Sequence, residues 1–296
     1  MLFPTSNIIS QELKDDLFEQ KQVRVTVLRL DRIDPVASGN KLFKLHYFLQ
    51  NAHRQSSTGI VTFGGAFSNH IAATASAGKE YGIQTAGIIR GEELNENSND
   101  VLKFAADNGM KLFFVGREEY RLIRQTEILP HKISVHLSSP LSSILFLPEG
   151  GSNALAVRGC REIVKNIHED FDFIVCPVGT GTTLAGISSA LNDDQTAIGI
   201  SVLEGKDFLE KNITAFNGGR TNFRLFHDYS FGGYAKSNDE LNIFCKKFSE
   251  EHGILIEPVY TGKMFYGVYD LIRKNYFKPG ARIVTVHTGG TNSRSH

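Results

Sequence analysis

The sequence has few of the residues that define several common protein classes. It contains three cysteines in 296 residues, and Cys160, Cys176 and Cys245 stand far apart. They form no Cys-x-x-Cys pair and no cluster with histidine. An odd number of scattered cysteines argues against a framework of disulfide bonds and against a structural zinc site. We therefore expect a protein without disulfides and without a metal centre.

An excess of one charge and long apolar runs are also absent. Lys+Arg and Asp+Glu both number 32, so the formal net charge is zero. The chain therefore lacks the basic excess that would indicate nucleic acid or an anionic membrane as a partner. No run reaches the roughly 18 consecutive apolar residues that a membrane-spanning helix needs. Residues 1–18 include acidic side chains and lack the apolar core of a signal peptide. We therefore expect a cytoplasmic protein that binds neither nucleic acid nor a membrane.

What the sequence does contain is an alternation of strand-like and helix-like segments. Hydrophobic residues make up 41% of the chain, enough to fill a core. The alternation predicts crossover units and parallel sheets with helices on both faces. In such sheets, ligands bind beyond the carboxyl ends of the strands. The predicted strands are 23–30, 60–63, 85–89, 111–115, 173–178, 197–202 and 282–287, and the predicted helices are 41–54, 68–81, 100–108, 183–191 and 240–252.

The first candidate motif is the segment 38–44, Ser-Gly-Asn-Lys-Leu-Phe-Lys. It places Lys41 where a loop meets a helix, just after the flexible Gly39. A lysine that must react with an aldehyde needs a free amine with a depressed pKa, which burial or nearby cations can supply. Taken alone, however, the segment favours an ordinary surface lysine at a helix start.

The second motif is Gly-Gly-Ala-Phe-Ser-Asn-His at 64–70, where a predicted strand ends and a helix begins. Ser68 or Asn69 would serve as a plain helix N-cap, and this role alone would explain them. Free N–H groups at a helix start also suit a carboxylate, and Asn69 could hydrogen-bond a ring hydroxyl of a ligand. Both interpretations fit the segment.

The third motif, Gly-Thr-Gly-Thr-Thr-Leu-Ala-Gly at 179–186, follows a predicted strand directly. Its glycines, hydroxyls and helix start are typical of a phosphate-binding turn. It is not a P-loop, because no Gly-Lys-Ser/Thr follows, and Leu184 replaces the third glycine of a dinucleotide fingerprint. Two further segments, Glu-Pro-Val-Tyr-Thr-Gly-Lys at 257–263 and His-Thr-Gly-Gly at 287–290, are weak signals individually: Tyr260 could be a core phenol and Thr288 a turn residue.

Together, in this order, these motifs resemble the tryptophan-synthase-β-like (fold type II) enzymes that use pyridoxal 5'-phosphate (PLP). The resemblance spans roughly residues 30–290 and is greatest to the branch that contains D-cysteine desulfhydrase and 1-aminocyclopropane-1-carboxylate (ACC) deaminase. It implies an α/β fold of two three-layer domains with largely parallel, twisted sheets. The small inserted domain would be 45–148, the large PLP-binding domain 1–44 and 149–296, with the active site between them. Homodimers are usual in such enzymes, so a homodimer is expected.

The resemblance also implies roles for particular residues. Lys41 would carry PLP as a Schiff base, with Lys44 a competitor disfavoured by its position inside the helix. Asn69 would contact the ring hydroxyl of PLP, Ser68 the substrate, and Tyr260 would lie over the active site. The loop 150–153 resembles another family segment near the cofactor. The phosphate would be bound by Gly179, Thr180, Gly181, Thr182 and Thr183.

The choice of reaction depends on Thr261 and Thr288. ACC deaminases resemble one another in having glutamate and leucine at these two places, and glutamine at the place of His70. A carboxylate beside the pyridine nitrogen would keep it protonated and make the ring a strong electron sink, which we expect the opening of a cyclopropane ring to require. This chain has hydroxyl residues at both places, and in this it resembles the desulfhydrase-like members.

The sequence therefore favours PLP-dependent α,β-elimination from a small amino acid, with D-cysteine giving pyruvate, ammonia and sulfide as the leading candidate. Lys41 would also shuttle the α-proton, while Tyr260 and Ser68 would position the substrate or assist proton transfer. The alternative within the same fold is ACC deaminase, which the absent glutamate disfavours. An alternative of another class is a noncatalytic protein that binds a phosphate ligand with residues 179–183.

Overall fold

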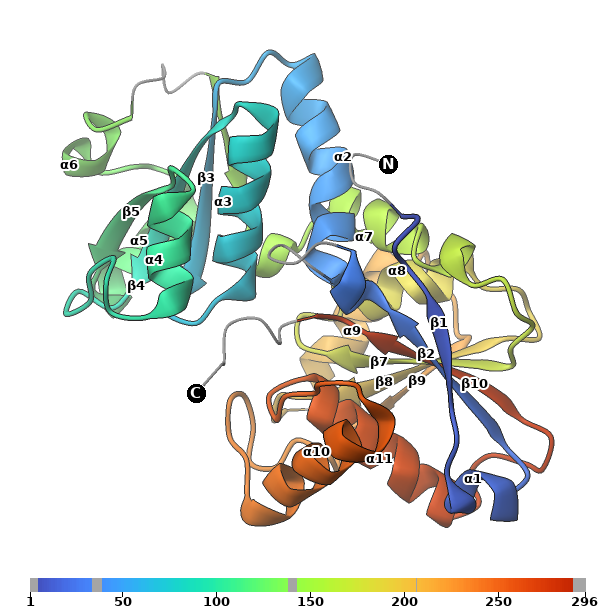
Figure 1. Ribbon diagram of the computed structural model, residues 1–296. Coiled ribbons are helices and arrows are strands. Elements are labelled where there is room, and N and C mark those ends of the chain that lie inside the picture. The colour runs from blue at the N-terminus through green and yellow to red at the C-terminus, as the bar shows by residue number, and fades with distance from the viewer. Residues whose placement is uncertain (1–4, 34–38, 138–142, 206, 290–296) are drawn as a thin grey trace.

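The chain forms two separate β-sheets, seen as two lobes in the computed structural model of Figure 1. The structure describes residues 5–33, 39–137, 143–205 and 207–289. The strands are β1 Ser10–Leu13, β2 Arg24–Arg29, β3 Gly59–Gly65, β4 Gln84–Arg90, β5 Lys111–Val115, β6 Ile144–Leu147, β7 Phe173–Val178, β8 Thr196–Ser201, β9 Phe223–Phe226 and β10 Arg282–His287. The helices are α1 Asp16–Gln20, α2 Asn40–Arg54, α3 Asn69–Tyr81, α4 Asp100–Asp107, α5 Arg117–Thr126, α6 His131–Ser134, α7 Ala154–Arg161, α8 Thr182–Ala190, α9 Asp207–Phe216, α10 Asp239–His252 and α11 Thr261–Arg273, with short 3₁₀ turns η1 Leu30–Arg32, η3 Glu149–Gly151 and η4 Val164–Asn166.

Both sheets are parallel apart from one edge strand. The larger sheet has the order β1-β2-β10-β7-β8-β9, and the smaller one the order β5-β4-β3-β6. All pairs are parallel except β1 with β2. The carboxyl ends of β7 and β10 lead into the glycine-rich turn and the His-Thr-Gly-Gly segment, and that of β3 leads into the Gly-Gly-Ala-Phe-Ser-Asn segment. The three candidate loops therefore all follow the carboxyl ends of parallel strands, which is where ligands bind in sheets of this kind.

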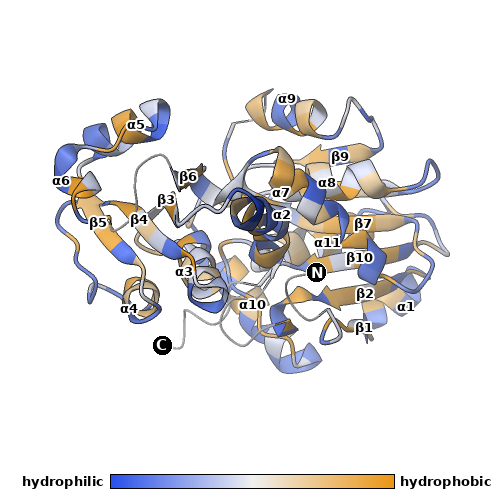
Figure 2. Cartoon of the chain, turned by 90° about the horizontal axis from the view of Figure 1, so that it is seen from above, coloured by the Kyte–Doolittle hydropathy of each residue, from blue (hydrophilic) through white to orange (hydrophobic). Residues whose placement is uncertain are grey.

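Helices cover both faces of each sheet, which confirms the predicted α/β fold. On the larger sheet, one core joins residues of β2, β7 and β8 to α10 and α11, and a second core joins the opposite face to α2, α7, α8 and α9. On the smaller sheet, α5 and α6 cover one face, and α2, α3 and α4 cover the other. Figure 2 shows hydrophobic residues concentrated on the strands and hydrophilic residues along many of the connecting loops.

The helix α2 joins the two sheets. Leu42 and Phe43, in its first turn, pack in a core of the larger sheet, whereas Leu45, Phe48 and Leu49 pack in a core of the smaller sheet. The predicted domain boundary at residue 45 thus falls inside one continuous helix, and it stays a prediction. Because α2 is rigid and packs on both sides, it fixes the position of its own first turn relative to both sheets.

Every strand and helix predicted from the sequence is present, with ends shifted by at most a few residues. The prediction missed several elements, among them β1, β6, α7 and α11. Among the described residues, no helix combines the length and the hydrophobicity needed to cross a membrane.

Candidate active site

A cavity of about 510 Å³ lies between the two sheets at the carboxyl ends of their strands. Its size suits a small cofactor with a substrate. All residues predicted for the site line this cavity except Thr182 and Thr261. Ser38 and Gly290, the outer residues of two of the motifs, lie outside the described part of the chain.

The lysine segment is held in place by the loop that follows β10. Gly39 has φ +86°, and a Cβ atom there would lie 2.0 Å from the backbone oxygen of Thr288. Only glycine allows this close approach. The backbone N–H of Asn40 donates to the same oxygen at 3.3 Å. The first turn of α2 is therefore bound to the His-Thr-Gly-Gly segment, which brings Lys41 and Thr288 into one wall.

The amide of Asn40 connects Lys41 to the glycine-rich turn. Asn40 Nδ2 donates to Thr183 Oγ1 at 2.8 Å, and Lys41 Nζ donates to Asn40 Oδ1 at 3.3 Å. Burial, with help from the neighbouring Lys44 ammonium, lowers the pKa of Lys41 to about 7. A lysine with this pKa is about half neutral near pH 7, and the neutral amine is the form that attacks an aldehyde.

Lys44 is the second buried amine of the site. Its side chain is 4% exposed, and Nζ donates to the backbone oxygen of Gly150 at 3.0 Å. Gly150 in turn lies beside Thr180, because a Cβ atom there would be 3.4 Å from Thr180 Cγ2. The Lys44 ammonium therefore lies near the glycine-rich turn. The sequence prediction treated Lys44 only as a competitor of Lys41, but its place suits a counter-ion for a phosphate.

Backbone conformation and hydroxyl contacts shape the glycine-rich turn. Gly181, the N-cap of α8, has φ +86°, and a Cβ atom there would lie 2.9 Å from Ile213 Cγ1. Thr182 Oγ1 hydrogen-bonds Ser152 Oγ at 2.6 Å and Thr180 Oγ1 at 3.1 Å. Thr182 thus ties the loop 150–153 to the turn from behind, while Gly179, Thr180, Gly181 and Thr183 line the cavity.

The opposite wall is the β3–α3 loop. Ser68 is the N-cap of α3, and its side chain accepts a hydrogen bond from the backbone N–H of Ile71. Ser68 and Asn69 are partly exposed and line the cavity, and so does His70, which is buried. The N-cap and the ligand-binding interpretations of Ser68 are therefore compatible in one structure.

The start of α11 is capped by Glu257. Its carboxylate accepts hydrogen bonds from the backbone N–H groups of Val259, Tyr260 and Thr261 at 2.6, 2.9 and 3.0 Å. The hydroxyl of Thr261, which is fully buried, also donates to this carboxylate at 3.3 Å. Negative charge at a helix N-terminus is favourable, so this carboxylate stabilises the turn that carries Tyr260. The pKa of Tyr260 is raised well above its ordinary value, chiefly by burial.

Two residues near the start of α11, Lys263 and Tyr234, were not predicted from the sequence to contribute to the site. Lys263 is fully buried, and its Nζ donates to the backbone oxygens of Ser230 and Gly233 at 2.6 and 2.7 Å. It thereby holds the loop that leads to Tyr234, which lines the cavity with its ring 5.9 Å from that of Tyr260. Lys263 belongs to the Pro-Val-Tyr-Thr-Gly-Lys motif noted in the sequence, but the motif did not indicate its role. Its partners lie about thirty residues earlier, and no local pattern identifies them.

These residues fit PLP. Lys41 offers an amine that is about half neutral near pH 7 for the aldehyde, and Asn69 offers an amide for the ring hydroxyl. The turn 179–183 offers N–H and hydroxyl donors for the phosphate, with the Lys44 ammonium nearby. The aldehyde, the ring hydroxyl and the phosphate of the cofactor thus each have a chemically matched partner in one cavity.

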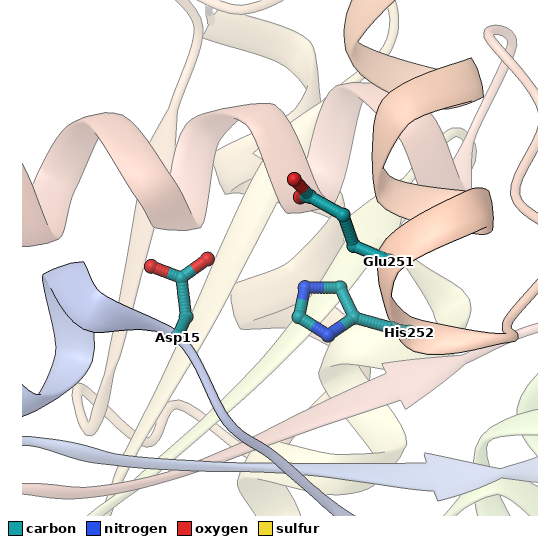
Figure 3. Close-up of side chains that lie close together, drawn as sticks. All are labelled: Asp15, Glu251 and His252. Carbon is teal, nitrogen blue, oxygen red and sulfur yellow. The ribbon is translucent and has the colours of Figure 1, made fainter.

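One group of side chains elsewhere has the composition of a metal site. Ligand atoms of Asp15, Glu251 and His252 lie within 4.8 Å of one another (Figure 3). They are already engaged: Asp15 accepts hydrogen bonds from Leu17 N and from the Tyr269 hydroxyl, which also contacts His252 Nε2 at 2.9 Å. This network joins α1 to α10 and α11, and we assign it a structural role.

Several known proteins are similar to this chain in sequence or in fold. A putative ACC deaminase of Pyrococcus horikoshii is 32% identical over 277 residues, covering 87% of this chain and 82% of that protein. A bifunctional D-cysteine desulfhydrase/ACC deaminase of Arabidopsis thaliana mitochondria is 30% identical over 278 residues, covering 86% of this chain and 69% of that protein. A D-cysteine desulfhydrase of Klebsiella pneumoniae is 26% identical over 292 residues, covering 90% of this chain and 87% of that protein. The crystal structure of an ACC deaminase homologue has a TM-score of 0.83 and 28% identity, covering 99% of this chain and 92% of that one.

The family of pyridoxal-phosphate-dependent enzymes matches residues 13–289. That span includes the cavity and every described residue predicted to form it. With the matched amine, turn and donors in place, the chain belongs to the family of pyridoxal-phosphate-dependent enzymes.

Proposed function

We propose that the protein catalyses PLP-dependent α,β-elimination from a small amino acid, with D-cysteine and water giving pyruvate, ammonia and sulfide. The observation that carries the proposal is Lys41: an amine with a pKa of about 7, tied through Asn40 to Thr183 of the glycine-rich turn. An amine of this kind serves first to bind the cofactor and then to take up the α-proton.

Bound PLP supplies an electron sink for the bonds at the substrate Cα. The chain supplies the rest. The helix start at Ser68 and Asn69 offers donors for the substrate carboxylate, and residues 179–183 with Lys44 hold the phosphate. Tyr260 stays a neutral phenol at working pH because burial raises its pKa. It can therefore donate a proton or a hydrogen bond at the substrate side chain.

The preference for D-cysteine over ACC depends on Thr261 and Thr288, which stand where ACC deaminases have glutamate and leucine. Glu257 is the carboxylate that lines this part of the cavity, but it accepts three backbone hydrogen bonds and one from Thr261. A carboxylate so engaged is poorly placed to hold a proton on the pyridine nitrogen. This supports elimination over opening of a cyclopropane ring.

The test is to incubate the purified, PLP-loaded protein with D-cysteine, L-cysteine, D-serine and ACC separately. We expect sulfide and pyruvate from D-cysteine, at a rate well above that of any product from ACC. Release of 2-oxobutanoate from ACC without sulfide from D-cysteine would reverse the assignment. A protein that binds PLP but converts none of the four would favour the noncatalytic alternative.

We also propose a cytoplasmic location and a homodimer. Cys160, Cys176 and Cys245 are all free and buried, which suits a reducing compartment. The homodimer is proposed from the resemblance of the motifs to those of dimeric enzymes. Light scattering of the purified protein would test it, with twice the 32.8 kDa chain mass as the expected result.

A further inference from the structure

His70, next to Asn69 on α3, has one ring nitrogen without a partner. The residue is 1% exposed and lines the cavity. Its Nε2 lies 2.7 Å from Thr62 Oγ1, on β3. Its Nδ1 is buried and makes no hydrogen bond with any residue that the structure describes. A buried polar atom without a hydrogen-bond partner is energetically unfavourable, so such an atom in a ligand cavity indicates a missing partner.

The hydrogen bonds around Thr62 determine which form of the imidazole is present. Thr62 Oγ1 lies 2.9 Å from the backbone oxygen of Leu147, which can only accept. The single hydroxyl proton of Thr62 is therefore used there, and His70 Nε2 must donate its N–H to Thr62 Oγ1. In a neutral ring, Nδ1 then carries a lone pair and no proton. It can accept a hydrogen bond but cannot donate one.

Burial, together with the charges around the ring, keeps it neutral. Burial is the main cause that holds the pKa of His70 well below its ordinary value, and the ammonium groups of Lys41 and Lys44 add to the effect. The cysteine facing the same lysines, Cys160, has a raised pKa and adds no negative charge at neutral pH. Gly151 lies beside this nitrogen, since a Cβ atom there would be 3.5 Å from Nδ1.

We propose that His70 Nδ1 is the acceptor for an N–H of a primary ammonium group in this cavity, either that of Lys41 or the α-ammonium of the incoming amino acid. The lone pair attracts an ammonium and repels a carboxylate. His70 would therefore orient the amine of the substrate toward the cofactor, with the carboxylate directed to the N–H groups at the α3 start. The inference has two arms, one for each possible donor. The substrate arm rests on the proposed function, whereas the Lys41 arm does not depend on it.

Two substitutions separate this role from a structural one. The side-chain amide of His70→Gln reaches the position of Nε2, so it keeps the contact with Thr62 and loses the acceptor at Nδ1. The shorter His70→Asn reaches the position of Nδ1, so it keeps an acceptor there and loses the contact with Thr62. Thermal melts of both variants would first establish that each is folded.

The substrate arm uses D-alanine, which has no leaving group at Cβ, and follows its binding to the PLP-loaded protein by the change in visible absorbance. We expect His70→Gln to weaken binding by roughly 10-fold or more, the loss expected for one hydrogen bond to a charged group. His70→Asn should weaken binding by no more than about 3-fold, because it keeps the acceptor. The KM for D-cysteine should change in parallel, with a smaller effect on kcat.

The Lys41 arm uses the cofactor-free protein. The rate of acetylation of Lys41 by acetic anhydride is measured against pH by mass spectrometry. If Lys41 is the donor, His70→Gln shifts the midpoint below that of the wild type and His70→Asn does not, because losing an acceptor destabilises the ammonium. An unchanged midpoint with weaker D-alanine binding would identify the substrate as the donor.

The inference is wrong if both variants match the wild type in both arms, or if His70→Asn is the more damaged variant in both. The second outcome would mean that the contact with Thr62 is the role of His70. A wild-type protein that fails to bind PLP would overturn the proposed function instead, and the Lys41 arm would still report on His70.

Discussion

The two walls of the cavity differ in how firmly they are built. The wall from the larger sheet has buried hydroxyls and close backbone contacts: Thr182 and Thr183 are 0% and 5% exposed, and Gly39 touches the backbone of Thr288. The wall from the smaller sheet is the β3–α3 loop, in which Phe67 is 66% exposed and Ser68 and Asn69 are partly exposed. A tight, preformed wall suits a cofactor that stays bound, and a more open one suits a substrate that enters and leaves. We therefore expect the first wall mainly to bind the cofactor and the second wall mainly to bind the substrate.

The largest effect is expected at Lys41, in the first turn of the helix that joins the two sheets. Lys41→Ala should remove the covalent attachment of PLP and lower kcat by about 10³-fold or more, because one residue serves as both anchor and base. Lys44→Ala is the matched control, three residues along the same helix. It should keep the covalent attachment while weakening PLP affinity. Equal activity of Lys41→Ala and the wild type would contradict the account.

A substitution in the glycine-rich turn tests the firmness of the first wall. Gly181→Ala should weaken PLP binding by roughly 10-fold or more, since its φ of +86° costs about 1–3 kcal/mol for a side chain and the new Cβ meets Ile213. Gly218→Ala is a control with a similar φ of +76° and open space around it. It should lose comparable stability and keep its PLP affinity, measured by fluorescence titration.

Tyr260 tests whether the first wall also takes part in chemistry. Tyr260→Phe keeps the ring but removes the hydroxyl, and we expect kcat for D-cysteine to fall by roughly 10²-fold with PLP affinity unchanged. Tyr276→Phe, at a 40% exposed tyrosine outside the cavity, should leave kcat unchanged. If both variants keep full kcat, Tyr260 only packs against the ligand.

The smallest effect is expected at the second wall. Ser68→Ala should lower stability by about 1 kcal/mol through loss of the α3 cap and should also raise the KM for D-cysteine. Asn99→Ala removes the equivalent cap of α4, where the side chain accepts from Leu102 N at 3.0 Å outside the cavity. It should lower stability alone. Matching KM values in the two variants would mean that Ser68 serves only as a helix cap and does not bind the substrate.

The difference between the walls also explains what the sequence could predict. Runs of apolar residues and the glycines that end them are local signals, so the strands before each loop, and the lysine after Gly39, were found. The buried contact of Lys44 was not predicted, because its partner Gly150 lies 106 residues away. The same holds for Lys263 and the loop before Tyr234, which pair across about thirty residues. Contacts of this kind depend on the packing of the finished fold and leave no periodic pattern.

Chemical trapping of the cofactor shows directly whether Lys41 is the residue that binds it. The PLP-loaded protein is reduced with borohydride, digested and fragmented in the mass spectrometer, so that Lys41 and Lys44 are distinguished within one peptide. We expect the reduced cofactor on Lys41 and an unmodified Lys44. The cofactor on Lys44, on another lysine or on none would contradict it.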